Sequence, residues 1–426
     1  MNKNRTYTLP IILVTSLFFL WAFLHNINPI LIPHLKKACQ LTDTQSAFID
    51  TAVYLAYFSI ALPAGLFMHK YGYKKGIICG LFLYGLGAIL FLPAASTRSF
   101  GFFLFALFVI ASGATFLETV ANPYMTKLGD EKSGARRLNF AQSFNGVGAF
   151  LAPIIGGKFI LSGIEHTPDE LHQMQVAGQL QNYLQSEADT VKLPYLVITA
   201  GVLVLLGLFF VSKLPAGQTV HENTGSRFSL AVLKVPQVKW AVIAQFFYVG
   251  AQVGVGSFFV RFAKHAMDLP EKQAAYWWGY IAMVGFMLGR FVGTFLMKYV
   301  RAERLLFVYA LANIVLLFIA VFTHGKVAVY TLMAVPFFMS IMFPTIFALG
   351  VKDLGEETKI ASSFIIMSIV GGAVFPLLMG RISDATGGNI QLGYLVPIVC
   401  FIMVLVFALR QKVDVTVPKR SIALSH

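Results

Sequence analysis

The sequence predicts an all-α membrane protein with twelve spanning helices arranged as two halves of six. Three observations support this prediction. Hydrophobic residues make up 57% of the 426 residues and charged residues only 12%, whereas a soluble domain has about 25% charged residues. The apolar residues are gathered into runs long enough to cross a bilayer, which takes about 20 helical residues. A polar connector at 215–238 divides these runs six and six.

Each expected span is an apolar run that ends near clusters of charge. In chain order the spans are 9–33, 45–68, 76–95, 100–125, 140–161, 193–213, 240–261, 274–298, 305–322, 327–351, 360–383 and 392–409. The first run is longer than the apolar core of a signal peptide and lacks a cleavage pattern of small residues. We therefore expect it to remain as a spanning helix.

The basic residues predict the orientation in the membrane. They concentrate in alternate connections, for example Lys70, Lys74 and Lys75 after the second span and Arg136 and Arg137 before the fifth. Cytoplasmic loops carry such an excess of Lys and Arg, so both termini are expected in the cytoplasm. The net charge of +14 is explained by this topology, and no nucleic-acid partner is expected.

The expected domains are an N-terminal six-helix bundle at 1–214, a cytoplasmic linker at 215–238, a C-terminal six-helix bundle at 239–410 and a cytoplasmic tail at 411–426. The two halves resemble each other, because GLFMHKY at 65–71 follows the second span and GTFLMKY at 293–299 follows the eighth. Internal repeats of this kind are typical of secondary transporters. The long polar connection at 163–192 is expected outside the membrane as a candidate lid.

Glu118 is the strongest candidate for a functional residue. It follows an uncharged stretch at 101–116, and Asn122 lies one turn later on the same helix face. An ionised carboxylate at the centre of a bilayer costs at least ~2.5 kcal/mol, and intramembrane acids are usually functional. We expect Glu118 to exchange a proton or a cation while a solute crosses. The alternative is a permanently protonated Glu118 that is hydrogen-bonded to a neighbouring helix.

The first, fifth and seventh spans each carry polar residues at intervals that put them on one helix face. The candidate substrate-binding residues are Trp21, His25, Asn26, Asn28, Asn122, Gln142, Asn145, Gln245, Tyr248 and Gln252. Uncharged amides beside an aromatic surface suit a neutral polyhydroxy ligand, and a sugar fits that description. The alternative is that these residues are clamps between helices, as Asn and Gln often are in membrane bundles.

Two further charges lie within predicted spans. Asp50 shares a helix face with Tyr57 and lies about two turns from the outer end of the second span. It is either a second ion-coupling residue or an interfacial residue that pairs with Lys36 or Lys37. Arg290 is expected to anchor the eighth span near the cytoplasmic face.

Signatures of enzymes are missing from the sequence, which contains no P-loop, no HExxH and no CxxC pair. Its three cysteines, Cys39, Cys79 and Cys400, form no disulfide framework. We expect no enzymatic activity, no bound metal and no cofactor. Without a site for ATP, uphill movement of a solute would have to draw on an ion gradient.

Over essentially its whole length the chain resembles the fucose:proton symporter family of the major facilitator superfamily. The resemblance lies in SLFFLW at 16–21, LETVANP at 117–123, LNFAQSFN at 138–145, AQFFYVGAQ at 244–252 and PTIFALG at 344–350. It implies the major facilitator fold, with twelve helices in two pseudo-symmetric bundles, alternating access and a central sugar site. It also implies that Glu118 is protonatable and that Gln142 and Asn145 contact sugar.

The chain departs from the family pattern at one pair of positions. Pro29 stands where the pattern has an acid, and Asp50 stands where it has Gln. We hypothesise that Asp50 takes over part of the task of the missing acid. Because the change alters the acidic groups, sodium is an alternative coupling ion, since an acid with nearby amide oxygens can hold a hard cation.

Together these features predict a secondary active transporter that imports a monosaccharide by proton symport. The expected cargo is a hexose such as glucose, galactose, fucose or N-acetylglucosamine. The protein is expected in the lipid bilayer of a bacterial inner membrane, as a monomer. The alternatives are sodium-coupled sugar symport and export of other small metabolites.

Overall fold

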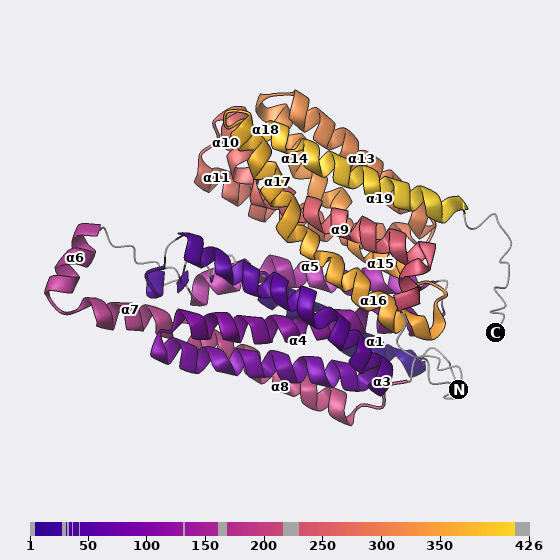
Figure 1. Ribbon diagram of the computed structural model, residues 1–426, viewed down its shortest axis with the longest axis horizontal. Helices are drawn as coiled ribbons and strands as arrows, with labels where there is room; N and C mark the ends of the chain where they lie inside the picture. Colours follow the sequence, from indigo (N-terminus) through magenta and orange to yellow (C-terminus); the bar gives the residue numbers. More distant parts are fainter. Residues whose placement is uncertain are drawn as a thin grey trace. The chain divides into compact units, whose positions relative to one another are not determined.

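The computed structural model describes residues 5–27, 31, 34–35, 37–41, 43–130, 133–160, 168–215 and 230–413. The described residues form helices and turns, with no strand among them (Figure 1). Contacts divide the chain into unit 1, Met1–Ser229 with Asp353–Ala373, and unit 2, Leu230–Lys352 with Val374–His426. Since Asp353–Ala373 groups with the N-terminal helices, the division into two bundles and a linker stays a prediction.

Unit 1 is built from two long helix pairs and shorter outer helices. It contains α1 (Arg5–His25), α3 (Asp43–Thr97), α4 (Phe100–Lys127), α5 (Gly134–Phe159), α6 (Pro168–Val176), α7 (Leu180–Asp189), α8 (Lys192–Val211) and α16 (Thr358–Met367). Helix α3 packs along α4 and α8, and α1 packs along α5 (Figure 1). The second and third predicted spans are joined in α3 through Gly72, whose φ of 81° is a conformation that glycine adopts without strain.

Unit 2 contains η2 (Leu230–Lys234), α9 (Pro236–Ser257), α10 (Phe259–Met267), α11 (Glu271–Tyr276), η3 (Trp277–Ala282), α12 (Met283–Leu296), α13 (Ala302–Phe322), α14 (Gly325–Met339), α15 (Met342–Gly350), α18 (Ile390–Gly393) and α19 (Leu395–Val413). Helix α17 (Gly371–Ala385) crosses the boundary between the units. Helix α13 packs on α14 and α19, and α9 packs on α15 and α19 (Figure 1). The tenth predicted span consists of two helices, because a turn at Ser340 and Ile341 interrupts the helix.

Within the described part of the chain, 9 helical stretches are long and apolar enough to cross a membrane. One of them, Thr51–Thr97, overlaps the second predicted span and covers the third, and the shorter apolar helix Tyr7–Phe23 overlaps the first. The fifth span lies in α5, which is 26 residues long. Where its residues are described, every expected span therefore overlaps a helix or consecutive helices. The first helix is the largest difference in bounds, since α1 ends at His25.

Long polar side chains satisfy the last carbonyls of neighbouring helices. Lys74 of α3 donates to the carbonyls of Phe210 and Ser212 at the end of α8, both at 2.9 Å. Gln237 of α9 donates to the carbonyl of Leu349 in α15 at 2.6 Å. The last four carbonyls of a helix have no partner within the helix. These contacts therefore hold helix ends in register with their neighbours inside each unit.

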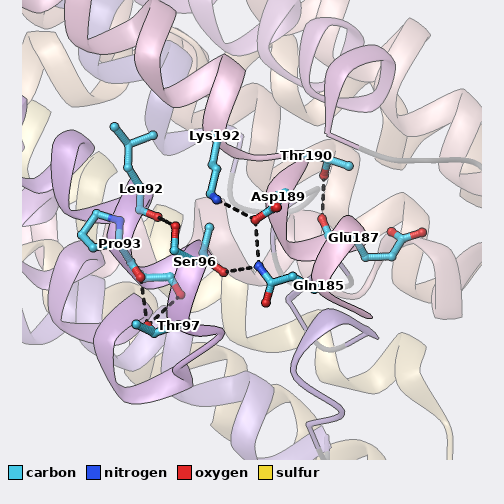
Figure 2. Close-up of polar contacts among 11 residues, drawn as sticks. Leu92, Pro93, Ser96, Thr97, Gln185, Glu187, Asp189, Thr190 and Lys192 are labelled. Carbon is cyan, nitrogen blue, oxygen red and sulfur yellow. Dashed lines mark hydrogen bonds and ion pairs between the residues drawn. The ribbon is translucent and has the colours of Figure 1, made fainter. Parts of the chain in front are cut away.

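The outer helix α7 is attached to unit 1 by polar contacts (Figure 2). Gln185 donates to the carbonyl of Ala95 near the end of α3 at 3.0 Å and to Asp189 Oδ1 at 2.8 Å. Lys192 Nζ also lies 2.8 Å from Asp189 Oδ1, as Figure 2 shows. Part of the candidate lid at 163–192 is therefore docked on the ends of spanning helices.

An ion pair between a half-buried lysine and a buried glutamate adds a second attachment of α7. Lys37 Nζ lies 2.9 Å from Glu187 Oε1, and the Glu187 side chain is only 3% exposed. His34 is buried beside this pair, and its Nε2 lies 3.4 Å from Thr190 Oγ1. Lys37 is thus paired with Glu187, while Lys36 and the side chain of Asp50 lie outside the described part of the structure.

Candidate functional site

Glu118 lies in α4, and its side chain is half-buried. A side-chain hydrogen bond joins it to Tyr57 of α3, which is only 3% exposed. Tyr84, also in α3, lies close enough to interact electrostatically with Glu118. A phenol hydroxyl donates to a carboxylate and accepts from a carboxylic acid. Tyr57 can therefore stay bound to Glu118 in either protonation state.

Two amides link α4 to α5 next to Glu118: Asn122 lies one turn beyond Glu118 in α4, and Gln142 lies in α5. Asn122 Nδ2 donates to the backbone carbonyl of Glu118 at 2.7 Å. Gln142 Nε2 donates to Asn122 Oδ1 at 3.3 Å. Asn122 is 0% exposed and Gln142 is 3% exposed. This ladder brings Asn122 and Gln142 together next to Glu118, and it also shows that both can act as a clamp between helices.

The polar face of α1 does not form one continuous surface. His25 is exposed at the end of α1, and its ring meets the Tyr57 ring edge-on, with centroids 6.5 Å apart. Trp21 is 2% exposed and packs against Phe18 with ring centroids 4.3 Å apart. His25 therefore joins the surroundings of Glu118 through Tyr57, whereas Trp21 is part of the packed core.

The structure describes the remaining candidate residues of unit 1 in less detail. Asn26 Nδ2 donates to the carbonyl of Ala22, one turn earlier, at 2.7 Å. Asn145 is half-buried in α5. Asn28 lies outside the described residues, and Asp50 is described only as part of the α3 backbone. A coupling role for Asp50 therefore stays a prediction.

The polar residues of α9 in unit 2 have different surroundings. Gln245 is 0% exposed, and neither its Oε1 nor its Nε2 has a hydrogen-bond partner among the described residues. Tyr248 donates to the carbonyl of Met339 at 2.9 Å, and Gln252 is half-buried. A buried unsatisfied amide costs about 1–3 kcal/mol. Gln245 is therefore no clamp between described helices, and it suits a bound water or a polar ligand.

Arg290 lies inside unit 2 and is only 4% exposed. Its Nε donates to the carbonyl of Ser340 at 3.1 Å, and its guanidinium lies 4.5 Å from the centre of the Phe286 ring. The carbonyl belongs to the break between α14 and α15, which cannot complete its own helical hydrogen bonds. Arg290 thus stabilises a helix break within the unit, because the break offers it an acceptor, and its anchoring near the cytoplasmic face stays a prediction.

A carboxyl group such as Glu118 can gain or lose a proton, and the amides near it can donate to and accept from an uncharged polar molecule. In the described ranges, no group of three or more His, Cys, Asp and Glu side chains could hold a metal ion. The sequence predicts Glu118, Asn122 and Gln142 as site residues, and that assignment stays a prediction. The sequence does not connect Tyr57 or Tyr84 with Glu118, since hydrophobic periodicity shows which face of a helix is polar but not which helix it meets.

Long apolar helices around a half-buried carboxylate and neighbouring amides define a polytopic membrane transporter. Residues 12–376 match the Major Facilitator Superfamily, and the chain belongs to this superfamily. It is 42% identical over 414 residues to the L-fucose-proton symporter of Escherichia coli strain K12, covering 96% of this chain and 94% of the relative. It is 38% identical to the glucose/galactose transporter of Brucella abortus, with 96% and 95% coverage.

A solved structure is similar over the same extent. The crystal structure of FucP, a Major Facilitator Superfamily transporter, in the outward conformation shares 42% sequence identity with this chain and superposes with a TM-score of 0.88. The match covers 95% of this chain and 99% of that chain. The predicted fold class and family are thereby confirmed, and the relatives are transporters, not enzymes.

Proposed function

We propose that the protein imports a monosaccharide together with a proton by alternating access. The observation that carries this proposal is the chain of contacts from His25 through Tyr57 to Glu118, next to the amide ladder of Asn122 and Gln142. It combines a group that can exchange a proton with groups that bind hydroxyls. The relatives named for L-fucose and for glucose/galactose support a hexose as cargo.

Sugar binding is assigned to the polar residues of each unit. In unit 1 the proposed contacts are Asn122, Gln142 and Asn145, with His25 at the exposed end of α1. In unit 2 they are Gln245 and Gln252, of which Gln245 has a buried amide that needs a partner. Amides both donate and accept, as sugar hydroxyls do, so specificity would come from the positions of the amides.

Coupling follows from the cost of enclosing a charge. An ionised Glu118 can be stabilised by Tyr57 while it is accessible to water, but burying the charge completely is expensive. Protonation removes the charge, so the loaded transporter can close around cargo and open on the other side. Proton and sugar therefore move together, and return of the empty carrier requires release of the proton.

Glu118→Gln tests this mechanism, since Gln has nearly the shape of a protonated Glu but cannot release a proton. In liposomes the variant should lose uphill uptake under a pH gradient and keep exchange of labelled sugar. Asn139→Ala is a matched control, because Asn139 is a buried polar residue whose amide donates to Ala135 of its own helix at 2.9 Å. If Glu118→Gln abolishes sugar binding as well, Glu118 is a ligand of the sugar and coupling lies elsewhere.

A panel of sugars under an imposed pH or sodium gradient separates the alternatives. Uptake that follows the pH gradient and distinguishes sugar epimers supports the proposal, whereas uptake that follows sodium supports sodium coupling. Transport without preference between epimers would favour an exporter of other metabolites. If Asp50→Asn still concentrates sugar normally, Asp50 has no coupling role.

The orientation and surroundings of the protein belong to the same proposal. Both termini are assigned to the cytoplasm, because the basic residues of the sequence lie in the connections on that side. The protein is assigned to the lipid bilayer of a bacterial inner membrane and acts as a monomer. Labelling of single cysteines placed in the connections from either side of the membrane checks the orientation.

A further inference from the structure

Helix α14 contains a proline that interrupts its hydrogen-bond ladder. Pro336 has no amide hydrogen, so the carbonyl of Leu332, one turn earlier, cannot receive the usual helical hydrogen bond. Both Pro336 and Leu332 are buried. In a membrane protein an unsatisfied backbone carbonyl is costly, and such carbonyls are usually served by side chains or by ordered water.

The facing helix α13 brings polar groups to this position. Helices α13 and α14 are consecutive and packed together, and only Thr323 and His324 separate them. The Tyr309 ring lies 5.3 Å from the Phe338 ring and 6.3 Å from the Phe337 ring, measured between centroids. Because the two helices run in opposite directions, a residue one turn after Tyr309 faces the turn of α14 before Phe337.

That residue is Asn313, and its side chain lacks a partner. Asn313 is 0% exposed and Tyr309 is 3% exposed. Among the described residues, the Asn313 Oδ1 and Nδ2 atoms have no hydrogen-bond partner. The Tyr309 hydroxyl has none either. Three orphaned polar atoms thus lie on one face of α13, opposite the helical turn in which Pro336 leaves a carbonyl unserved.

We propose that Asn313 and Tyr309 hold a buried water molecule that donates a hydrogen bond to the Leu332 carbonyl. A buried water makes about three hydrogen bonds to polar groups that would otherwise be unsatisfied. The Asn313 amide, the Tyr309 hydroxyl and the Leu332 carbonyl supply that number. The water replaces the amide hydrogen that Pro336 lacks.

Two carbonyls at the C-terminal end of α14 and in the break after it are also served by other helices. Tyr248 donates to the carbonyl of Met339, and Arg290 donates to the carbonyl of Ser340. The end of α14 and the break after it therefore depend in part on donors from other helices. A water can follow a moving carbonyl more easily than a fixed side chain can. The hydrated turn is the point at which α14 can bend at low cost.

The test is a set of melting temperatures for the full-length protein without sugar. If the orphaned groups bind water, Tyr309→Phe and Asn313→Leu should each lower the melting temperature by about 2 °C, because each removes a partner of the water. If the groups are dry, the same changes remove a buried unsatisfied group and should leave the melting temperature unchanged or raise it. The second result overturns the proposal.

Pro336→Ala separates loss of water from a packing defect, since it supplies the missing amide hydrogen. In this background the loss caused by Tyr309→Phe should shrink to less than half. Equal losses in both backgrounds would show that Tyr309 acts by packing alone and would overturn the proposal. Tyr309→Phe decides the question even if Asn313→Leu fails to fold, because it removes a single oxygen. The measurement needs no transport, so its outcome is independent of the proposed cargo and coupling ion.

Discussion

Tyr57 of α3 and Glu118 of α4 are joined by a side-chain hydrogen bond, and the Tyr57 ring also meets His25 edge-on. Tyr57 is therefore the residue through which α1, α3 and α4 meet at the carboxylate. Its hydroxyl can donate to the charged form of Glu118. The sequence does not reveal this contact, because the two residues are far apart along the chain. The contact makes Tyr57 the first residue to test.

Tyr57→Phe should raise the pH at which proton-driven uptake is half-maximal. The hydrogen bond to a charged group is worth about 1.5–3 kcal/mol, and its loss disfavours the carboxylate relative to the acid, so the shift should be about one pH unit. Uptake measured across a series of pH values checks this. Tyr71→Phe is the control, because Tyr71 is in the same helix and is 43% exposed. An unchanged profile for Tyr57→Phe would remove Tyr57 from the coupling machinery.

Gln142→Leu should weaken sugar binding at least about tenfold, which corresponds to 1.4 kcal/mol. The change removes a proposed sugar contact and also leaves Asn122 Oδ1 without the hydrogen bond from Gln142. Binding to purified protein and melting temperature should be measured together. A lower melting temperature with unchanged affinity would mean that Gln142 is a clamp between α4 and α5 and does not contact sugar.

Gly65→Ala should destabilise the packing of α16 on α3. A β-carbon at Gly65 would lie 1.6 Å from Ser363 Oγ and 3.1 Å from the Lys359 carbonyl, so the helices would have to separate. The melting temperature should fall by several degrees, and Ser363→Gly should restore part of the loss. Gly201→Ala is the matched control, because a β-carbon there meets nothing within 4 Å. Equal behaviour of the two alanine variants would contradict this packing.

The docking of α7 should weaken as the pH falls below about 6.5. Burial lowers the pKa of His34, Glu187 beside it acts in the opposite direction, and Lys37 lowers it further. Undocking exposes His34 and returns its pKa toward the ordinary value, so the undocked state binds more protons. The contribution of His34 to docking is therefore present above this pH and is lost as the pH falls through the lowered pKa.

Hydrogen exchange of residues 180–189 as a function of pH measures this docking. The protection factor, which corrects for the slower intrinsic exchange at acid pH, should fall as the pH is lowered in the native protein, and His34→Gln should reduce that fall. Lys37→Met should increase exchange at every pH, because it leaves the buried Glu187 without its cation. If His34→Gln leaves the pH dependence unchanged, the response belongs to Glu187 instead.

The sequence by itself determined the spans and the family, and it predicted Glu118 as the candidate acid. Spans can be found from local sequence because the thickness of a bilayer sets the length of each apolar run. Glu118 can be found because a charge in such a run is rare and costly. Neither inference requires knowledge of which helices are neighbours.

The tertiary structure decided which polar residues share a partner. Trp21 and His25 lie on one predicted face of α1, yet Trp21 is in the core and His25 is exposed. Gln142 and Gln245 have the same side chain, but Gln142 is bound to Asn122 while Gln245 has no partner in the described part of the chain. Hydrogen bonds need atoms within about 3.5 Å, and that proximity is set by packing between helices that are distant in the sequence.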